Sequence, residues 1–361
     1  MKLPSVCVVG PLPPLSGGMG NQCQLLVRLL RSEGLQVELV QTNAPYRPTW
    51  VGRVPLLRAA FRLAPYLRRL WQAIANADVV HVLANSGWAW HLFAAPAIAI
   101  ARLHGAAVIV NYHGGNADSF FAGAPRHVLK LLAVSSLRVL PSPYLQRVFA
   151  HYGLSSEVIP NIVDLSLFTP AAARPPALQP HIVITRNLEP IYDIATAIRA
   201  LVRIRQHAPL AHMTIAGSGP ERENLQKLAA ELGQNSAIHF VGRLANDDVA
   251  KLVASASCLL NPSTVDNMPV SILEAFACGV PVVSTQAGGI PDMLEHGVAG
   301  LLVPVGDADA MADAVLCIVH NPMLALHFSS VGLVEVEKYS WAKVRRQWLE
   351  AYCRAAVGVQ P

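Results

Sequence analysis

Short apolar runs alternate with longer amphipathic segments along both halves of the chain. The apolar runs are typical of strands that are buried on both faces, as in parallel sheets. In the first half they predict strands at Ser5–Val9, Gln36–Gln41, Val79–Leu83, Ala107–Asn111, Leu137–Leu140 and Glu157–Ile159. In the second half they predict strands at His181–Thr185, His212–Ala216, Ile238–Val241, Ser257–Leu260, Val280–Ser284 and Gly300–Val303. Strands that alternate with helices predict an α/β protein with two Rossmann-like parallel sheets.

The proline-rich stretch TPAAARPPALQP separates the two halves. Proline lacks a backbone donor and favours extended chain, so this stretch predicts a linker. At 361 residues the chain is also longer than one hydrophobic core usually serves. We therefore predict an N-terminal domain at residues 1–168, a linker at 169–180 and a C-terminal domain at 181–340. A final helix at 341–361 is expected to pack back across both domains.

The composition, 53% hydrophobic and 14% charged, excludes a disordered chain. The six cysteines lack the spacing of metal ligands, which favours reduced thiols in a cytoplasmic protein. The most apolar stretch, Leu92–Ala101, is well short of the roughly 20 residues of a membrane-spanning helix, so we expect no transmembrane segment.

Positive charge is concentrated in the first half of the chain. Residues 1–170 carry a net charge of +8 and the remainder −3, which together give the overall +5. The densest part is residues 53–74, where arginines are interleaved with Leu, Phe, Tyr and Trp. Such a segment suits an anionic membrane surface or an anionic acceptor, but a solvated helix with an apolar stripe toward the core has the same pattern. We expect no nucleic-acid partner.

Two carboxylates eight residues apart, Asp266 and Glu274, stand in NPSTVDNMPVSILEAFACGVPVVSTQAGGIPDML. A strand ends before them, and Pro269 favours a helix that begins near it. The first N–H groups of that helix, from Val270 and Ser271 onward, suit a diphosphate. Glu274, one turn further in, is placed to accept bonds from ribose hydroxyls, and Asp266 from hydroxyls of a sugar. By spacing alone, an ordinary strand-to-helix loop with a solvated Asp and a helical Glu is the better explanation of both residues.

The whole string resembles the E-x7-E region of the retaining glycosyltransferases of family 4, including EA-x-A-x-G-x-P-V-V and A-G-G-I-P. The resemblance implies a GT-B fold, two Rossmann-like domains whose sheets face across a cleft, and a nucleoside-diphosphate sugar as donor. The family usually has Glu at the first position, where this chain has Asp266.

A glycine-rich loop, GPLPPLSGGMGNQ, follows the first strand. Gly17 and Gly18 allow close approach of a ligand, and a helix is predicted from near Asn21. The loop lacks the G-x-G-x-x-G fingerprint of dinucleotide binding. Its position matches the family's glycine loop near the donor phosphates.

The string NYHGGNAD places His113 at the end of a predicted strand. A lone histidine is more often structural, but in the family a histidine at this place faces the donor sugar. The string PNIVDLSLF resembles the segment that closes the family's first domain, and we interpret Asn161 and Asp164 in it as structural.

In the second half, ITRNLEPIYD resembles the family's G-R-L-x-x-x-K-G string. Arg186 matches its arginine, which the resemblance assigns to the donor diphosphate, but Ile191 stands where the family has lysine. Arg243 either compensates for that lysine or braces a loop. In AGSGPERENL, Gly217 and Gly219 form a turn that is expected to pack against the nucleotide base.

Two aspartate pairs resemble metal ligands only in spacing. Asp307 and Asp309 precede a helical run, and Asp247 and Asp248 precede another, so helix capping accounts for all of them. We predict no metal ion and no cofactor besides the donor sugar nucleotide.

These motifs together predict transfer of a sugar from a nucleoside-diphosphate sugar to a hydroxyl of a saccharide or lipid-linked acceptor. Retention is implied by the resemblance, and the setting is cell-surface polysaccharide or glycolipid synthesis at the inner face of the cytoplasmic membrane. The predicted catalytic residues are His113, Arg186, Asp266 and Glu274. The predicted nucleotide-binding residues are Gly17, Gly18, Gly217, Gly219, Arg243, Asn267, Met268, Pro269, Val270, Ser271 and Glu274. Two alternatives remain: a sugar-nucleotide epimerase, and a non-catalytic GT-B subunit, which Asp266 and Ile191 motivate.

Overall fold

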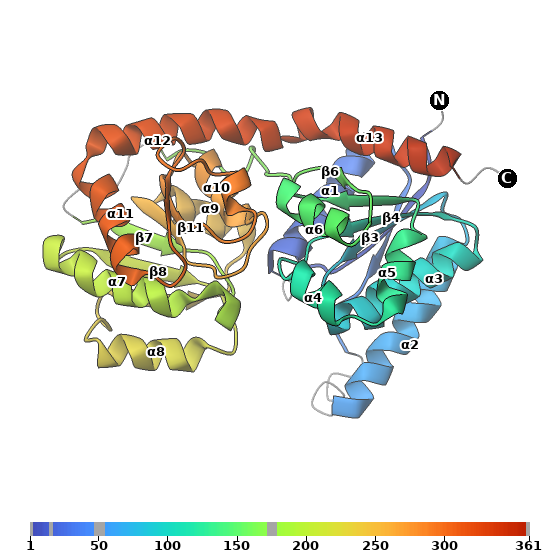
Figure 1. Cartoon of the computed structure of the whole chain (residues 1–361), viewed down its shortest axis with the longest axis horizontal. Helices are drawn as coiled ribbons and strands as arrows, with labels where there is room; N and C mark the ends of the chain where they lie inside the picture. The colour runs from blue at the N-terminus through green and yellow to red at the C-terminus, as the bar shows by residue number, and fades with distance from the viewer. Residues whose placement is uncertain (1–2, 14–16, 47–54, 172–178, 359–361) are drawn as a thin grey trace. The chain divides into compact units, whose positions relative to one another are not determined.

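The computed structural model describes residues 3–13, 17–46, 55–171 and 179–358. The chain divides into two compact units. Unit 1 comprises Met1–Ile162 and Val344–Pro361, and unit 2 comprises Val163–Lys343. Each unit contains a six-stranded sheet in which all neighbouring strands are parallel (Figure 1).

The sheet of unit 1 has the strand order β2-β1-β3-β4-β5-β6, so β2 and β6 are its edges. Its strands are β1 (Val6–Gly10), β2 (Val37–Gln41), β3 (Val79–Ala84), β4 (Ala107–Tyr112), β5 (Leu137–Leu140) and β6 (Glu157–Val158). Its helices are α1 (Gly17–Ser32), α2 (Pro55–Ile74), the π-helix η2 (Trp90–Ala94), α3 (Ala95–Leu103), α4 (Ala117–Gly123), α5 (Arg126–Ala133), α6 (Pro143–His151) and α13 (Trp341–Val357).

Alternate residues of the strands pack on opposite faces of this sheet. Val80 and Val82 of β3 join a core with Tyr66 and Leu70 of α2 and with residues of α3 to α6. His81, between the two valines, faces the other way and contacts Tyr352 of α13. The C-terminal helix is therefore part of unit 1, although it follows unit 2 in the sequence.

The sheet of unit 2 has the order β12-β11-β10-β7-β8-β9, which places β7 and β10 side by side at its centre. Its strands are β7 (His181–Ile184), β8 (His212–Ala216), β9 (Ile238–Gly242), β10 (Cys258–Asn261), β11 (Val282–Thr285) and β12 (Leu301–Val303). Its helices are the 3-10 turn η3 (Pro190–Tyr192), α7 (Ile194–His207), α8 (Arg222–Glu231), α9 (Asn246–Ala254), α10 (Val270–Ala277), η4 (Ile290–Asp292), α11 (Ala308–His320), α12 (Pro322–Glu335) and η5 (Val336–Tyr339).

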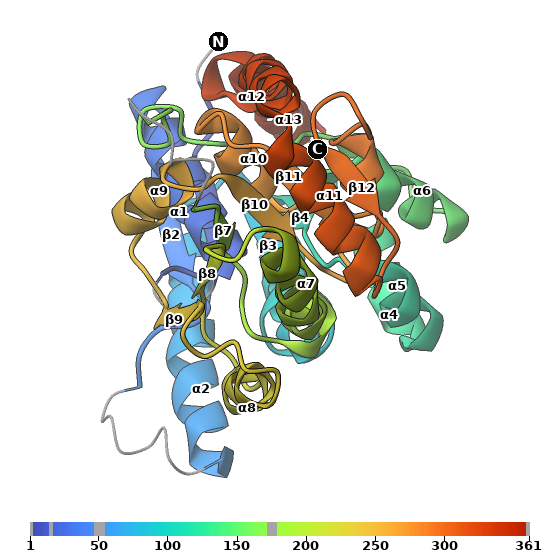
Figure 2. The same ribbon diagram turned by 90° about the vertical axis from the view of Figure 1, so that its left-hand side faces the viewer.

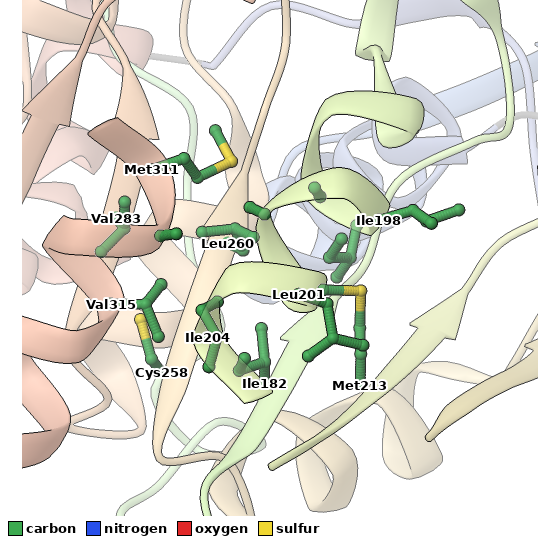
Figure 3. Close-up of a cluster of buried hydrophobic side chains, with 14 of the residues drawn as sticks. Ile182, Ile198, Leu201, Ile204, Met213, Cys258, Leu260, Val283, Met311 and Val315 are labelled. Carbon is green, nitrogen blue, oxygen red and sulfur yellow. The ribbon is translucent and has the colours of Figure 1, made fainter. Parts of the chain in front are cut away.

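Two apolar layers enclose the sheet of unit 2. On one face, α7 and α11 pack together, and Leu201 and Val315 join strand residues such as Leu260 in one cluster (Figure 3). On the other face, residues of α9 and α10 cover the sheet (Figure 2). The carboxyl ends of β7 and β10 continue into loops. Ligands of open α/β sheets bind at this end of the strands.

The sequence predicts each of these strands to within two residues at either end. Three details differ. Helix α1 begins at Gly17, four residues before the predicted start near Asn21. The boundary between the units lies after Ile162, six residues before the predicted 168. From Val344 onward α13 belongs to unit 1, whereas the sequence predicts a helix that packs across both domains. Most of the predicted linker, residues 172–178, lies outside the described residues.

Candidate functional site

Arg186 and Asp266 form an ion pair that joins the loop after β7 to the loop after β10. Their side chains are only 11% and 12% exposed. Ser263 lies between them: its hydroxyl accepts from Arg186 Nη2 at 3.4 Å and is 3.2 Å from Asp266 Oδ2. The guanidinium is therefore held in place by groups of the neighbouring loop, at the carboxyl end of the sheet.

The 3-10 turn η3 adds a second connection between the same two loops. The ring of Tyr192 lies under the Arg186 guanidinium, 4.1 Å from it, which is a cation–π contact. The carbonyl of Ile191 accepts from both the amide and the hydroxyl of Thr264, at 2.8 Å and 3.0 Å. The side chain of Ile191, at the position of the family's lysine, is 40% exposed.

Helix α10 begins directly after this loop, at Val270, and Pro269 is its N-cap residue rather than its first helical residue. The N–H groups of Val270 and Ser271 have no intrahelical acceptor, as at any helix start. Ser271 is 5% exposed, and its hydroxyl has no hydrogen-bond partner among the described residues. Donors of this kind at the positive end of a helix suit an anion.

Glu274 lies one turn further along α10 and is 9% exposed. Burial raises the pKa of its carboxyl to about 7, although the positive charge of Arg186 acts in the opposite direction. A carboxyl group that titrates near neutrality in a buried position is typical of functional sites. Ligand hydroxyls would supply the hydrogen bonds that water gives an exposed carboxylate.

The residues between the two carboxylates differ in what they can offer a ligand. Asn267 donates its backbone N–H to Asp266 Oδ1 at 2.9 Å and thereby fixes that carboxylate. The side chain of Met268 is buried in the apolar layer beneath α10. Contact of Met268 with a nucleotide stays a prediction.

Gly217 and Gly219 follow β8 and pack against the loop that carries Arg186. A Cβ atom on Gly217 would lie 1.9 Å from the carbonyl oxygen of Arg186, and one on Gly219 would lie 2.2 Å from that of Leu188. Close approach of the two main chains therefore explains both glycines without a ligand. Contact of this turn with a nucleotide base stays a prediction.

Arg243, in the loop after β9, donates from Nη2 to Asn187 Oδ1 at 3.5 Å. Asn187 directly follows Arg186. Of the two roles considered for Arg243, the contact is that of a brace on the loop that positions Arg186.

His113 lies in unit 1, at the end of β4, and its backbone N–H donates to the carbonyl of Ala84 at 2.9 Å. Burial lowers the pKa of its imidazole to about 4, so the ring is neutral at pH 7. Gly17 and Gly18 also lie in unit 1, where they form the first turn of α1 instead of a loop. Arg186, Asp266 and the residues of α10 therefore lie in unit 2, whereas His113, Gly17 and Gly18 lie in unit 1.

The aspartates considered as metal ligands are at helix starts, as predicted. Asp307 caps α11 by accepting from the Ala310 N–H at 2.9 Å, and Asp247 and Asp248 lie in the first turn of α9. Within the described ranges, no three His, Cys, Asp or Glu side chains converge as metal ligands would.

The basic segment forms helix α2 from Pro55 onward, and residues 53–54 lie outside the described residues. Tyr66, Leu70 and Ala73 face the core of unit 1, which accounts for the apolar stripe. Arg62 stacks on the ring of Tyr46 at 4.2 Å. Arg68 and Arg69 line a surface groove.

Sequence reasoning did not identify Tyr192 and Ser263 as part of the site, although both contact Arg186. Tyr192 stands next to Ile191, so the absence of the lysine was the available signal. A ring beneath the guanidinium is a feature that only the folded loop displays.

Comparison with known proteins identifies the family to which the chain belongs. The pattern of the family described as "Glycosyltransferase Family 4" matches residues 16–167, and that of "Glycosyl transferases group 1" matches residues 179–321. A GDP-mannose-dependent alpha-(1-6)-phosphatidylinositol monomannoside mannosyltransferase of Mycobacterium tuberculosis is 30% identical in an alignment of 270 residues. The alignment covers 68% of this chain and 68% of the relative. The chain belongs to glycosyltransferase family 4. The phosphatidyl-myo-inositol mannosyltransferase of Mycolicibacterium smegmatis is 26% identical over 93% of this chain and 90% of its own.

Solved structures show the same GT-B architecture. Sucrose-phosphate synthase from Thermosynechococcus elongatus has a TM-score of 0.76 at 18% identity, covering 98% of this family 4 chain and all of its own. An Anabaena protein in complex with UDP-glucose has a TM-score of 0.75 at 19% identity, with coverage of 96% and 99%. No single helix among the described residues is long and apolar enough to cross a membrane. The helical segments Ala308–His320 and Pro322–Val357, which meet at a bend of 98°, reach that length and hydropathy only as a pair.

Proposed function

We propose that this glycosyltransferase moves a hexose from a nucleoside-diphosphate sugar to a hydroxyl of a lipid-linked or saccharide acceptor, with retention of anomeric configuration. The observation that carries the proposal is the position of Arg186 beside Asp266, in the loops that lead to the N-terminus of α10. Arg186 offers guanidinium donors and the helix start offers N–H groups, and both kinds of donor suit a diphosphate.

Each residue of this group has a defined task in the proposed reaction. Arg186 and the N–H groups of Val270 and Ser271 bind the donor diphosphate and stabilise the charge that develops on it as the glycosidic bond breaks. Glu274 accepts hydrogen bonds from the ribose hydroxyls. Asp266 orients Arg186 and accepts from a hydroxyl of the donor sugar.

Retention follows from the family and is proposed to occur on one face of the sugar. The diphosphate leaves, and the acceptor hydroxyl attacks from the same side while it gives its proton to the departing phosphate oxygen. His113 is neutral at pH 7 and contributes hydrogen bonds to the donor sugar rather than a positive charge. Unit 1 binds the acceptor.

A mannosyl donor and a phospholipid acceptor have the support of the relatives' names, which specify GDP-mannose and phosphatidylinositol. The net charge of +8 over residues 1–170 suits an anionic acceptor. We propose that the enzyme is cytoplasmic and works peripherally at the inner face of the cytoplasmic membrane, in glycolipid, lipopolysaccharide or other cell-surface polysaccharide synthesis.

Thermal shift of the purified protein against a panel of nucleotides and nucleotide sugars tests donor binding. GDP-mannose and UDP-glucose are the first members of the panel, and one nucleotide class should raise Tm. The variant Glu274→Gln should lose that shift and sugar transfer, whereas Glu295→Gln, an exposed carboxylate of the same unit, should keep both. Transfer that is unaffected by Glu274→Gln, or a product with inverted anomeric configuration by NMR, contradicts the proposal.

A further inference from the structure

Tyr192 contacts both the hydrophobic core of unit 2 and the side chain of Arg186. It packs against the buried cluster that α7, α11 and the strands form, and the central carbon of the Arg186 guanidinium lies 4.1 Å from the centroid of its ring. Burial raises the pKa of the phenol, although the positive charge of Arg186 acts in the opposite direction. The ring is therefore uncharged at neutral pH, and it attracts the guanidinium through the electrons of its face.

A strained turn holds the ring in this place. Asp193, directly after Tyr192, has a φ of 39°, and it is the one residue other than glycine with a positive φ among those that the structure describes. This left-handed conformation is unfavourable for a residue with a side chain. It is maintained because the Asp193 carboxylate accepts from the N–H and the hydroxyl of Thr196, at 3.4 Å and 2.6 Å. Maintained strain beside a candidate site points to a role for the turn in that site.

The residue before the ring is fixed to the opposite loop. The carbonyl of Ile191 accepts from the amide and the hydroxyl of Thr264. Thr264 follows Ser263, whose hydroxyl accepts from Arg186, and Asp266 pairs with the same guanidinium. One loop therefore contacts the guanidinium through its edge, and the other contacts it through the ring beneath its plane.

These contacts leave the Arg186 side chain little freedom. Its Nη2 faces Asp266 and Ser263, one face of the group lies on Tyr192, and its Nε is buried with no hydrogen-bond partner among the described residues. A free arginine side chain has many rotamers, and it loses that freedom when it binds a ligand. A guanidinium that is fixed beforehand binds an anion more tightly, and its charge is already in place when negative charge develops on a leaving group.

We propose that Tyr192 is a positioning residue for sugar transfer, which holds the Arg186 guanidinium in the orientation in which it meets the donor diphosphate. The inference rests on the proposed function, because that function assigns the diphosphate to Arg186. The family's G-R-L-x-x-x-K-G string has glycine at the position of Tyr192, so the ring distinguishes this chain from the string. Asp266 and Ser263 fix the edge of the guanidinium, and Tyr192 fixes its plane.

Substitutions that keep an apolar side chain separate this role from packing. Tyr192→Leu and Tyr192→Met can still pack against the core but lack an aromatic face, whereas Tyr192→Phe keeps the face. Calorimetry with GDP and with UDP should show that the Leu and Met variants bind about tenfold more weakly, and that Tyr192→Phe binds as wild type does. Tyr339→Leu, at a half-buried tyrosine in another 3-10 turn of unit 2, should leave the affinity unchanged.

A double-mutant cycle decides whether Tyr192 acts through Arg186. In the Arg186→Met background, Tyr192→Leu should leave GDP or UDP affinity unchanged, because the group that the ring positions is gone. A residue that only stabilises unit 2 would weaken binding by the same factor in both backgrounds, and that result overturns the proposal. Wild-type affinity in both Tyr192→Leu and Tyr192→Met overturns it as well.

The Nε–H of Arg186 reports its own position without a ligand. In isotope-labelled protein its NMR signal should exchange slowly with water, because the atom is buried. Tyr192→Leu should accelerate that exchange about tenfold, while Tyr192→Phe and Tyr339→Leu should not. An unchanged rate in Tyr192→Leu refutes the positioning role alone. Faster exchange in Tyr192→Leu, in a protein whose wild type binds no nucleoside diphosphate, supports the positioning of Arg186 and refutes the proposed function.

Discussion

Arg186 and Asp266 face each other across two loops that are eighty residues apart in the sequence. The pair is almost fully buried, so removal of either partner leaves an unsatisfied charge. We expect Arg186→Ala to destabilise unit 2 by about 3 kcal/mol and to weaken nucleoside diphosphate binding at least about tenfold. Denaturant unfolding and calorimetry measure the two effects.

Asp266→Asn serves as the companion variant because it keeps the hydrogen-bonding shape and removes the charge. It should lower the unfolding midpoint less than Arg186→Ala does, because the amide oxygen still accepts a hydrogen bond from Arg186, and it should raise the donor KM, since Arg186 loses its orientation. Arg199→Ala, on the exposed side of α7, controls for loss of positive charge. If Arg199→Ala weakens nucleotide binding as much as Arg186→Ala, the specific role of the pair is wrong.

The missing lysine leads to a gain-of-function prediction. The Ile191 side chain is 40% exposed, while its carbonyl is held by Thr264, so the side chain can change without loss of the loop's anchor. Ile191→Lys should tighten nucleoside diphosphate binding by about tenfold or less, because it adds a second cation next to Arg186. Ile191→Met adds length without charge and should have no such effect. Equal affinity for the lysine and methionine variants would place this side chain away from the diphosphate.

Glu274 makes stability depend on pH in a defined direction. Its pKa is about 7 in the folded protein against an ordinary value of 4.5, so between these values the folded state holds the extra proton. The contribution of Glu274 to stability should therefore fall as pH rises through this window, by up to about 3 kcal/mol, and Glu274→Gln should abolish it. The difference in denaturant midpoint between wild type and Glu274→Gln, taken at about pH 5 and about pH 8, measures this contribution, because the histidines of the two proteins are the same.

The same carboxyl should couple donor binding to a proton. If the ionised form accepts the ribose hydroxyls, nucleotide affinity should rise between about pH 6 and about pH 8, with release of a proton. Calorimetry in buffers of different ionisation enthalpy detects that release. Binding in which wild type and Glu274→Gln show the same pH profile argues against contact with this carboxylate.

The sheets could be predicted from sequence because strands buried on both faces are almost continuously apolar. The start of α1 could not, because Gly17 and Gly18 are poor helix formers and indicate a loop. Only the structure shows that Tyr66 and Leu70 of α2 lie in the core. Periodicity gives the face of a helix but not what that face contacts.

The charged residues of the candidate site were predicted from the resemblance of their motifs to the family, but their immediate surroundings could not be predicted. Nothing local to Arg186 indicates that Tyr192 folds back beneath it. The glycines at 217 and 219 indicate close approach of something to the chain, and the sequence cannot tell ligand from main chain. In the structure the main chain of residues 186 and 188 occupies that space.

Those glycines give a structural prediction with functional consequences. Gly217→Ala places a methyl group 1.9 Å from the Arg186 carbonyl, where no side chain can yield, so the loop that carries Arg186 has to shift. We expect a lower Tm and reduced nucleotide affinity together. Gly123→Ala, whose Cβ would meet no atom within 4 Å, should change neither. A Gly217→Ala protein that binds nucleotide normally would show that the loop tolerates displacement.

The C-terminal helix depends on a buried histidine of the first sheet. His81 Nδ1 lies 2.6 Å from the Tyr352 hydroxyl, and its ring stacks on Trp348 with 4.9 Å between centroids. Tyr352→Phe removes one partner of this buried bond and should cost about 1–3 kcal/mol. Hydrogen exchange in α13 should accelerate, whereas Tyr144→Phe, a partly buried tyrosine of α6, should leave it unchanged.

Acid should loosen the same contact. Burial lowers the pKa of His81 to about 3, with a contribution from the charge of His113, against an ordinary value of 6.5. Between these values the unfolded chain binds the proton that the folded chain refuses, so stability falls as pH falls through this window. His81→Phe should reduce that dependence and leave the part due to His113, whose pKa burial also lowers. If His81→Phe and wild type lose stability in parallel from about pH 6.5 to about pH 4, the histidine is already protonated at the helix contact, and the attachment of α13 has another basis.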